Sequence, residues 1–554
     1  MTVPAFDVVF VGGSAFTAGW EDSRPWGVGV RDGRIAAVGS EDRLRADADG
    51  ATRVVDLAGG LLVPAFHDAH AHPVTGGVEL LQCDLSGAAT AEECLSLIAA
   101  YAAAHPDEEW IVGGGWTMSH FPGGLPAAAA IDRILPDRPV ALQNRDHHGM
   151  WVNGEALRRA GVTPATPDPA DGRIERHVDG SPSGVLHEGA MRLIEAVIPE
   201  TRPELVLAGL RRAQAEFFAQ GIVGWADAWV GRMPGVGDIL DTYVAALEQG
   251  VLRARVTAAL WWERSRGIEQ LADLAAQRER IAALGRSEVL RADAIKIMVD
   301  GVAENFTAAM SRPYLDGCGH PTTNAGMTFL APAALAEAAI AADAAGFHLH
   351  FHALGDRAVT LALDALEAAR ARNGHGPRRH QLAHLQVVQP DDVPRFAALG
   401  VAANLQMLWG AVDEQLAELT FPFLEPELVA RHYPFRDLRD AGAALAAGSD
   451  WPVSTADPLE AIRVGATRAS AGAVADPRLD PRQAIDLASA FAAYTAGSAA
   501  INGHGAQSGR LRVGMRADLA VLDGDPFVLG AESLDGICVA QTWADGAIVH
   551  GEVD

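Results

Sequence analysis

The most informative stretch for the fold is Leu61-Leu62-Val63-Pro64-Ala65-Phe66-His67-Asp68-Ala69-His70-Ala71-His72. An apolar run of strand length ends in a His-x-His pair, and side chains two apart on a strand point to the same side. His70 and His72 can therefore bind one ion together. Imidazole suits zinc and similar divalent metals, but a catalytic ion needs about three protein ligands and a position for water. An isolated pair is equally consistent with histidines that cap a strand end.

Composition limits the classes of protein to consider. The 554 residues are 49% hydrophobic and 21% charged, which is typical of a globular protein with a large core. The formal net charge of −27 argues against a nucleic-acid partner and against attraction to an anionic membrane. The sequence begins without a basic segment followed by an apolar core, and no apolar run reaches membrane-spanning length. The four cysteines form no C-x-x-C pair, so we expect free thiols in a soluble cytoplasmic protein.

Strand and helix patterns predict an α/β protein with three parts. Short strand-like runs occupy both ends, so we expect residues 1–60 and 505–554 to form one small β-sandwich domain. The middle alternates strands with Ala-, Leu-, Glu- and Arg-rich helices, which is typical of a parallel sheet. Eight candidate strands make a (β/α)₈ TIM barrel the economical closure, over residues 61–75 and 201–504; they lie at 61–67, 221–228, 254–261, 293–299, 346–352, 380–385, 400–406 and 443–449. We interpret residues 76–200 as an insertion that covers the barrel mouth.

Polar residues fall where these strands end, which is where barrel enzymes place their catalytic groups. His352, His384 and Asp450 each close a strand, and Lys296 lies within the apolar run 294–301. A buried lysine is costly unless it is paired or chemically altered, so a functional role is favoured for Lys296. For His348, His350 and His380 a structural role is favoured, either filling the barrel interior or capping a strand, and Asp450 has an alternative role as a helix cap.

The order of these residues resembles the metal-dependent amidohydrolase superfamily. The phrases Lys296-Ile-Met-Val-Asp300-Gly301, His352-Ala-Leu-Gly355-Asp356-Arg357-Ala358, His384-Leu-Gln-Val-Val and Gly448-Ser-Asp450-Trp-Pro look like its amidohydrolase-3 branch. That branch includes N-substituted formamide deformylases and YtcJ-like proteins of unknown substrate. The resemblance spans nearly the whole chain.

The resemblance implies roles residue by residue. His70 and His72 would bind one metal, His352 and His384 the same or a second metal, and Asp450 would orient the nucleophilic water and carry its proton. Lys296 matches a lysine that is carboxylated and bridges both metals in binuclear relatives. Glu188 is a rival carboxylate ligand, or else it occupies a solvated helix N-terminus. The expected cofactor is one or two divalent ions, with zinc the first choice.

The insertion is expected to choose the substrate. Asp146-His147-His148-Gly149-Met150-Trp151-Val152-Asn153 resembles the branch's Asp-x-His-x-x-Trp-x-Asn segment, which implies that His148, Trp151 and Asn153 lie near the mouth. Trp116, Phe121, Trp409 and Trp451 are candidate aromatic walls, with core packing as the alternative. Arg312 and Tyr314 are candidates to hold a carbonyl or carboxylate, or else they brace a loop.

The function expected from the resemblance is hydrolysis of a linear amide or N-substituted formamide C–N bond in a small molecule, by a metal-activated water. Hydrolysis of a carbamate, ester or cyclic amide is the alternative within the enzyme class, because the same hydroxide serves them all. A scaffold that has lost catalysis is the alternative outside it. Homodimers are common in such families, but nothing in these residues demonstrates one.

Overall fold

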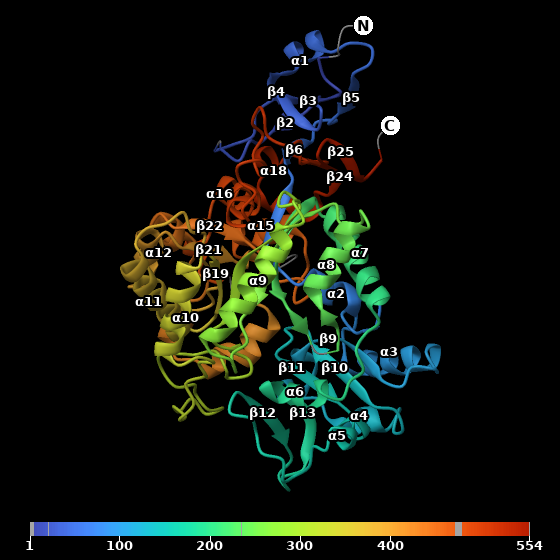
Figure 1. Cartoon of the computed structure of the whole chain (residues 1–554), viewed down its shortest axis with the longest axis vertical. Helices are drawn as coiled ribbons and strands as arrows, with labels where there is room; N and C mark the ends of the chain where they lie inside the picture. Colours follow the sequence, from blue (N-terminus) through green and yellow to red (C-terminus); the bar gives the residue numbers. More distant parts are fainter. Residues whose placement is uncertain (1–4, 20, 234, 471–478, 553–554) are drawn as a thin grey trace.

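The computed structural model contains a barrel of eight parallel strands at its centre (Figure 1). The residues that the structure describes are 5–19, 21–233, 235–470 and 479–552, so the parts of the predicted segments at 1–4, 20, 234, 471–478 and 553–554 lie outside the described residues. The strands run in sequence order around the sheet: β7 (Phe66–Ala71), β14 (Ile222–Val230), β17 (Arg255–Trp261), β18 (Leu290–Met298), β19 (His348–Ala353), β20 (Gln381–His384), β21 (Ala402–Leu405) and β22 (Ala444–Ala447). The predicted TIM barrel is confirmed.

The barrel closes between β22 and β7 just beyond the strand ends. The Asp450 amide donates to the His70 carbonyl at 2.7 Å, and the His72 amide donates to the Trp451 carbonyl at 2.8 Å. Gly448 permits this approach, because a β-carbon there would lie 2.6 Å from Cβ of His70. The closure therefore brings the first and last strands together at the His-x-His pair.

The strand predicted at 61–67 is divided between two sheets. Strand β6 (Leu61–Pro64) pairs antiparallel with β23 (Leu519–Leu522), whereas β7 begins at Phe66 and pairs with β14. The first part of the apolar run thus belongs to a sheet built with the C-terminal residues. The barrel strand is the second part, and it contains His70.

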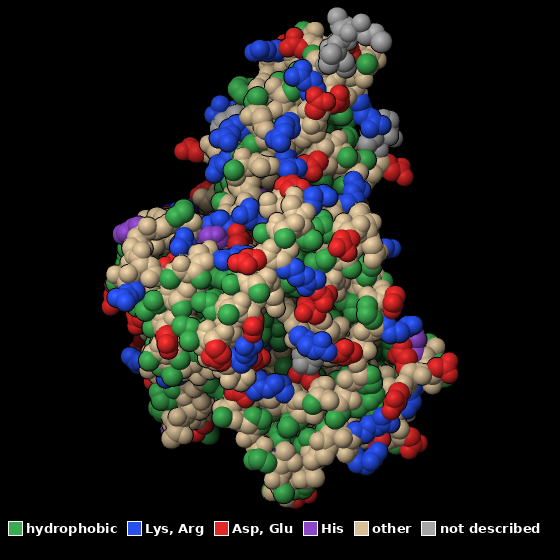
Figure 2. All heavy atoms as spheres, viewed as in Figure 1, with side chains coloured by type: hydrophobic (Ala, Val, Ile, Leu, Met, Phe, Trp, Pro, Cys, Tyr) green, Lys and Arg blue, Asp and Glu red, His purple; other side chains and the backbone are tan. Residues whose placement is uncertain are grey.

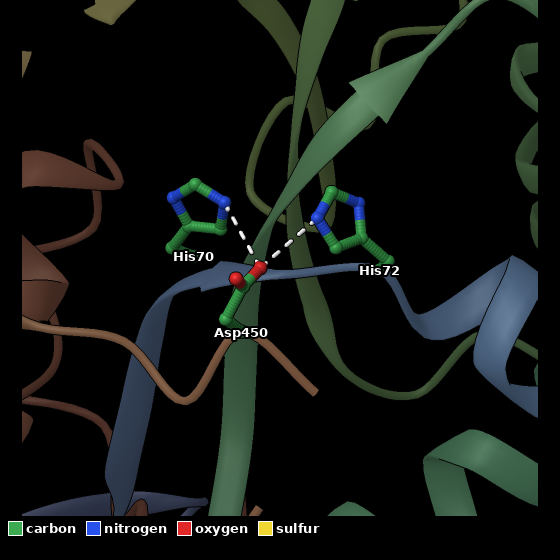
Figure 3. A group of neighbouring side chains, drawn as sticks. All are labelled: His70, His72 and Asp450. Atoms are coloured by element: carbon green, nitrogen blue, oxygen red, sulfur yellow. Dashed lines mark ion pairs between the residues drawn. The ribbon is translucent and has the colours of Figure 1, made fainter. Parts of the chain in front are cut away.

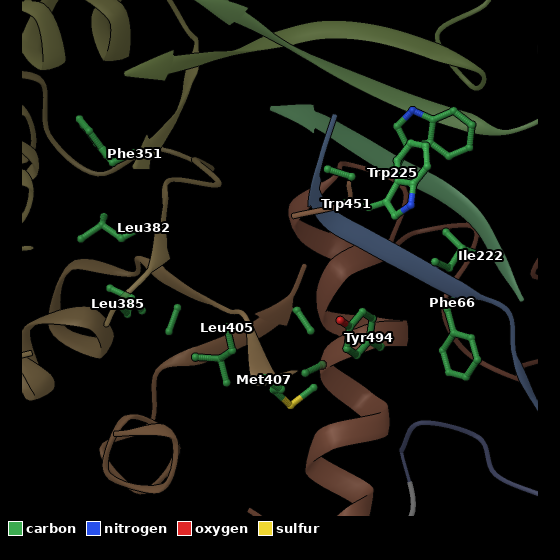
Figure 4. Packing of buried hydrophobic residues seen from close by; sticks show 14 of the residues in the cluster. Phe66, Ile222, Trp225, Phe351, Leu382, Leu385, Leu405, Met407, Trp451 and Tyr494 are labelled. Carbon is green, nitrogen blue, oxygen red and sulfur yellow. The ribbon is translucent and has the colours of Figure 1, made fainter. Parts of the chain in front are cut away.

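Helices follow the strands and cover the outside of the barrel (Figure 1). They include α7 (Pro203–Ala219), α8 (Ile239–Glu248), α9 (Leu271–Ala282), α10 (Pro332–Ala344), α11 (Asp356–Asn373), α12 (Val393–Leu399) and α15 (Pro458–Thr467). Their apolar faces pack against the strands in one large buried cluster. Figure 4 shows part of it, where Phe66 and Ile222 lie near Tyr494 and Leu405 lies beside Met407.

Two further sheets are formed by the chain ends. One has the order β4-β3-β1-β5, from β1 (Val8–Val11), β3 (Trp26–Arg31), β4 (Arg34–Ser40) and β5 (Arg53–Asp56). The other has the order β2-β6-β23-β24-β25, with β2 (Ser14–Ala15), β24 (Val539–Ala544) and β25 (Ala547–His550). Phe10 from the first sheet and Trp543 from the second pack edge to face at 5.2 Å. N-terminal and C-terminal strands therefore share one core.

The segment after α2 (Pro73–Glu79) forms a mixed sheet at the end of the barrel opposite the chain termini (Figure 1). Its order is β12-β13-β11-β10-β9-β8, from β8 (Cys83–Asp84), β9 (Ile111–Trp116), β10 (Val140–Asn144), β11 (Gly149–Val152), β12 (Gly172–Arg176) and β13 (Pro182–Glu188). Helices α3 (Ala91–Ala104), α4 (Ala128–Asp132) and α5 (Gly154–Arg159) accompany it.

The distribution of charged side chains and the state of the cysteines can be compared with what the composition predicts. Acidic and basic side chains are interspersed over the face shown in Figure 2. The four cysteines are free, with Cys83 and Cys94 buried. Each helix among the described residues is too short or too polar to cross a membrane.

Candidate metal centre

Three predicted site residues meet where the barrel closes (Figure 3). Oδ1 of Asp450 lies 3.2 Å from Nε2 of His70 and 3.1 Å from Nε2 of His72. One ligand atom from each residue lies within 4.8 Å of the other two. His70 is on β7, His72 follows it directly, and Asp450 lies three residues beyond β22. Residues at the ends of the barrel's first and last strands, or just beyond them, thus form one cluster.

His384, His352 and Lys296 surround this cluster. The rings of His70 and His384 are 4.7 Å apart, those of His352 and His384 are 4.3 Å apart, and Nζ of Lys296 lies 3.2 Å from Nε2 of His70. Both ring nitrogens of His384 are buried and have no hydrogen-bond partner among the described residues. A divalent ion would satisfy such unpartnered nitrogens, so the donor set fits a metal.

The electrostatics favour neutral histidines and an ionised aspartate. Burial lowers the pKa of His70 to about 3, helped by the Lys296 charge, and burial holds the pKa of His352 and His384 well below the usual range. Burial raises the pKa of Asp450, but the neighbouring His70 and His72 outweigh it, and the pKa lies well below its usual value. Neutral imidazole and carboxylate are the forms that bind metals.

Lys296 is the only lysine in the chain, one of 44 lysine and arginine residues. It lies on β18, is 2% exposed, and sits beside the cluster. Burial lowers the pKa of its amine to about 7, against the attraction of Asp450 and Asp227. A substantial share of the amine is therefore uncharged at neutral pH, which is the form that reacts with electrophiles.

His350 supports the cluster from behind, a role the sequence prediction did not give it. Its Nε2 lies 2.9 Å from Nδ1 of His70, and Nε2 of Gln381 lies 3.3 Å from Nδ1 of His350. A partner on Nδ1 fixes the ring of His70 with Nε2 toward Asp450. Strand alternation was the available signal, since His348, His350 and His352 point to the same side of β19.

Asp300 positions the loop that follows His352. Its carboxylate accepts hydrogen bonds from the amides of Ala309 at 2.8 Å, Leu354 at 3.1 Å and Gly355 at 2.9 Å. It joins the end of β18 to the residues directly after β19. This aspartate acts through backbone amides and does not join the cluster itself.

Three site residues have left-handed backbone conformations. The φ angles are 57° for Asp450, 78° for His384 and 53° for Glu188. Residues with side chains rarely adopt this region, and such strain concentrates at functional sites. The surrounding structure therefore holds these three side chains at some energetic cost.

Glu188 lies at the end of β13 and is paired with His148. Oε1 of Glu188 lies 2.9 Å from Nδ1 of His148 and accepts a hydrogen bond of 2.9 Å from the Thr307 hydroxyl. Burial lowers the pKa of His148, but the Glu188 carboxylate outweighs it and the pKa is raised to about 9. The His148 ring lies 5.4 Å from that of His352. The His148 side chain thus contacts Glu188 and also lies near His352. The role of Glu188 as a metal ligand stays a prediction.

A cavity of about 770 Å³ opens onto the centre. His148, His352, His384 and Asp450 line it, together with Trp409 and Trp451. Its walls come from the barrel loops, from the insertion and from the segment 408–416. The cluster is therefore accessible to a small molecule.

Six predicted pocket residues are absent from the described lining of the cavity: Trp116, Phe121, Trp151, Asn153, Arg312 and Tyr314. Trp116 and Trp151 are 0% exposed and pack in the core of the insertion, where their indoles donate to the carbonyls of Leu142 and Ala127. Asn153 caps α5 by accepting from the Ala156 amide at 3.0 Å. The two tryptophans thus agree with the core-packing alternative for the aromatic residues, whereas the capping role of Asn153 was not among the expectations.

Arg312 and Tyr314 brace a loop. The guanidinium of Arg312 pairs with Glu425, and the Tyr314 hydroxyl donates to the Ala308 carbonyl at 2.8 Å from a buried position. These contacts agree with the alternative of a loop brace, and the binding roles of these two residues stay predictions. Of the predicted mouth residues, His148, Trp409 and Trp451 line the cavity.

Comparisons with known proteins show the family to which the chain belongs. The model of the amidohydrolase family Amidohydro_3 matches residues 53–550, and the chain belongs to this family. The chain is 29% identical over 549 residues to YtcJ of Bacillus subtilis, covering 98% of this chain and 99% of that protein. It is 27% identical over 555 residues to the N-substituted formamide deformylase of Arthrobacter pascens, covering 98% of both. An uncharacterized metal-dependent hydrolase from Pyrococcus horikoshii shares the fold, with a TM-score of 0.71, 22% identity and coverage of 95% of this chain and 99% of that one.

Proposed function

We propose that this protein is a metal-dependent hydrolase that cleaves the C–N bond of a linear amide or N-substituted formamide. The observation that carries the proposal is the Asp450 carboxylate, which faces Nε2 of both His70 and His72 and lines an accessible cavity. The family supports hydrolysis, and the deformylase relative supports the amide class. Carbamate, ester or cyclic-amide hydrolysis is the alternative.

The chain's own residues would hold the ion. His70, His72, His352 and His384 supply neutral nitrogens, and zinc is the metal that such a set suits best. A bound divalent ion lowers the pKa of its water to about 7 and polarises the substrate carbonyl. Carboxylated Lys296 would add a ligand for a second ion: its uncharged amine attacks carbon dioxide, loses a proton and becomes a carbamate.

Asp450 would move the proton. Its ionised carboxylate accepts the proton of the attacking water and returns it to the leaving nitrogen, which departs poorly as an anion. Protonated His148, held by Glu188, lines the same cavity and would donate a hydrogen bond to the substrate carbonyl oxygen as negative charge develops there. These roles use groups in the charge states described above.

The test is metal content by plasma mass spectrometry, with a Lys296→Ala variant beside the wild type and formate release from an N-substituted formamide as the activity. Two zinc ions per chain, falling in the variant, would support a lysine-bridged pair. One ion that is indifferent to Lys296 would support a single-metal hydrolase. Carefully purified protein with no metal and no activity would contradict the proposal and favour a scaffold.

We further propose the division into a β-sandwich of residues 1–60 and 505–554, a barrel of 61–75 and 201–504, and an insertion of 76–200. The small-molecule substrate, the cytoplasmic location and a homodimer complete the proposal. Size-exclusion chromatography with light scattering tests the last of these.

A further inference from the structure

The wall of the cavity is strongly acidic. Among the described residues that line it, Arg145 is the only arginine or lysine. Seven carboxylates besides Asp450 line the same cavity: Glu79, Asp84, Asp146, Glu304, Asp413, Glu414 and Glu460. A cavity with such an excess of one charge attracts ligands of the opposite charge and repels anions.

The charges of two of these carboxylates, Asp146 and Asp413, act on a third, Glu304. The Thr420 hydroxyl donates a hydrogen bond to Glu304 at 2.9 Å. The two histidines that follow Asp146 pair with other carboxylates, His147 with Glu79 and His148 with Glu188. Burial, with the charges of Asp146 and Asp413 as smaller causes, raises the pKa of Glu304 to about 7. Like charges close together in a half-buried site are relieved by a cation between them.

A separate observation points to a ligand that donates hydrogen bonds. Gln386 is 2% exposed and lines the cavity, and its side-chain oxygen has no hydrogen-bond donor among the described residues. Its carbonyl oxygen accepts from the Tyr433 amide at 2.9 Å, and Tyr433 in turn lies within range of the charges of Glu304 and Asp413. A buried acceptor without a donor is costly unless a ligand or water supplies one.

An aromatic surface adjoins the metal ligands in the same cavity. The Trp409 ring stacks on His384, with centroids 5.6 Å apart and planes 9° apart. Leu354 and Leu408 also line the wall. The body of a ligand that reaches the histidines therefore meets apolar surface.

We propose that the substrate amide carries a second, protonated amine, which Glu304 binds together with Asp146, Asp413 and the Gln386 side-chain oxygen. The aliphatic or aromatic part of the substrate lies against Trp409, and the C–N bond lies at His384 and Asp450. The substrate class is thus a mono-N-acylated or N-formylated diamine. This inference rests on the proposed amide hydrolysis and adds the chemistry of the substrate's other end.

Matched substrates test it. The N-formyl derivatives of hexamethylenediamine, aminohexanol and aminocaproic acid present an ammonium, a hydroxyl or a carboxylate on the same chain. For the zinc-loaded wild type we expect kcat/KM for the ammonium substrate to exceed that for the hydroxyl substrate by about 10- to 100-fold, the range of a charged hydrogen bond. The carboxylate substrate is expected to be the poorest.

Variants connect the preference to the acidic wall. Glu304→Gln is expected to bring the ammonium substrate down to the rate of the hydroxyl substrate without changing the latter, and Gln386→Leu to reduce the same preference. Glu418→Gln removes an exposed carboxylate outside the cavity and is expected to change neither. Equal rates for the ammonium and hydroxyl substrates in the wild type, or a preference that survives both cavity variants, would overturn the inference and leave amide hydrolysis standing.

Binding separates this inference from the proposed function. Calorimetry of the full zinc-loaded chain with hexylammonium chloride, against hexanol, needs no turnover. Hexylammonium binding that weakens at least tenfold in Glu304→Gln and in Gln386→Leu would support the acidic site even if no formamide were cleaved. Hexylammonium binding no tighter than hexanol binding would overturn it, whatever the amide activity.

Discussion

Ser449 contacts both carboxylate oxygens of Asp68. Its hydroxyl donates to Oδ2 at 2.5 Å, and its amide lies 3.1 Å from Oδ1 and 3.2 Å from Oδ2. Oδ1 also accepts from the His70 amide at 2.9 Å. One buried carboxylate thus sets the residue before Asp450 against the strand that carries His70. The relative position of the two segments that carry the candidate metal ligands depends on this contact.

Asp68→Ala is expected to lower both stability and metal content. It leaves the amides of His70 and Ser449 without an acceptor in a buried place, which costs about 1–3 kcal/mol for each group. Thermal unfolding and metal analysis measure the two effects. Ser449→Ala removes the hydroxyl bond and keeps the amide bonds, so it should lose less. Full metal content in Asp68→Ala would contradict the positioning role.

Asp450→Asn is expected to retain metal and to lose turnover. The amide keeps an oxygen beside His70 and His72, but it cannot accept the proton of water, and general acid–base catalysis contributes roughly 10²- to 10⁴-fold. Formate release under saturating substrate measures the loss in kcat. Wild-type kcat in this variant would exclude Asp450 as the proton carrier.

Gly448→Ala is expected to disrupt the centre without replacing any of the candidate ligands. The new methyl group would lie 2.6 Å from Cβ and 2.8 Å from the amide nitrogen of His70, so the two strands must separate. Such overpacking costs about 1–3 kcal/mol and should weaken zinc binding in a chelator competition. Gly39→Ala has no heavy atom within 4 Å of its added carbon and is the control. Equal zinc affinity in both variants would show that the close approach is unimportant.

Asp227→Asn is expected to flatten the pH dependence of stability. Burial raises the pKa of Asp227 to about 7, although the Tyr243 hydroxyl donates to it at 2.7 Å. The unfolded chain loses this proton near pH 4 and the folded chain near pH 7, so stability from this group falls as pH rises between these values.

Between pH 5 and pH 8 this share amounts to about 2–3 kcal/mol. Urea unfolding of metal-free protein at the two pH values measures it, and the variant should lose less stability than the wild type. Asp241→Asn, which removes an exposed carboxylate on α8, should behave like the wild type. Identical slopes for all three proteins would contradict the buried proton.

Replacement of Trp151 is expected to lower stability, and replacement of Trp409 is expected to weaken substrate binding. Trp151→Ala removes a fully buried indole from the insertion and should cost about 3–5 kcal/mol. Trp409→Ala removes a half-buried ring on the cavity wall and should raise KM several-fold with a small change in melting temperature. The reverse pattern would restore Trp151 to the pocket.

The barrel and its strand-end histidines were predictable because the signal is local. An apolar run that ends in His or Asp places that residue at the sheet's edge, whichever neighbours the strand acquires. His70, His384 and Asp450 are examples. The division at Ala65 was not predictable, since apolar character continues from Leu61 through Phe66 and only the partner strand β23 distinguishes the two parts.

The insertion was harder to interpret for a physical reason. A tryptophan suits a core and a pocket wall equally well, and its burial depends on contacts from distant segments. Trp116 and Trp151 form edge-to-face contacts with Phe121, which follows β9 in the insertion, whereas Trp409 stacks on His384 from the barrel. Considered alone, His350 was expected to have a structural role, although alternation along its strand puts it on the same side as His352.

The solitary lysine has a consequence for the ageing of the protein. Reducing sugars, aldehydes and cyanate attack uncharged amines, and guanidinium groups resist them because they stay protonated. The chain's one side-chain amine is enclosed in the barrel and would be shielded further by carboxylation and metal. The basic side chains on the surface of the protein are therefore arginines, and these reagents find no lysine amine there.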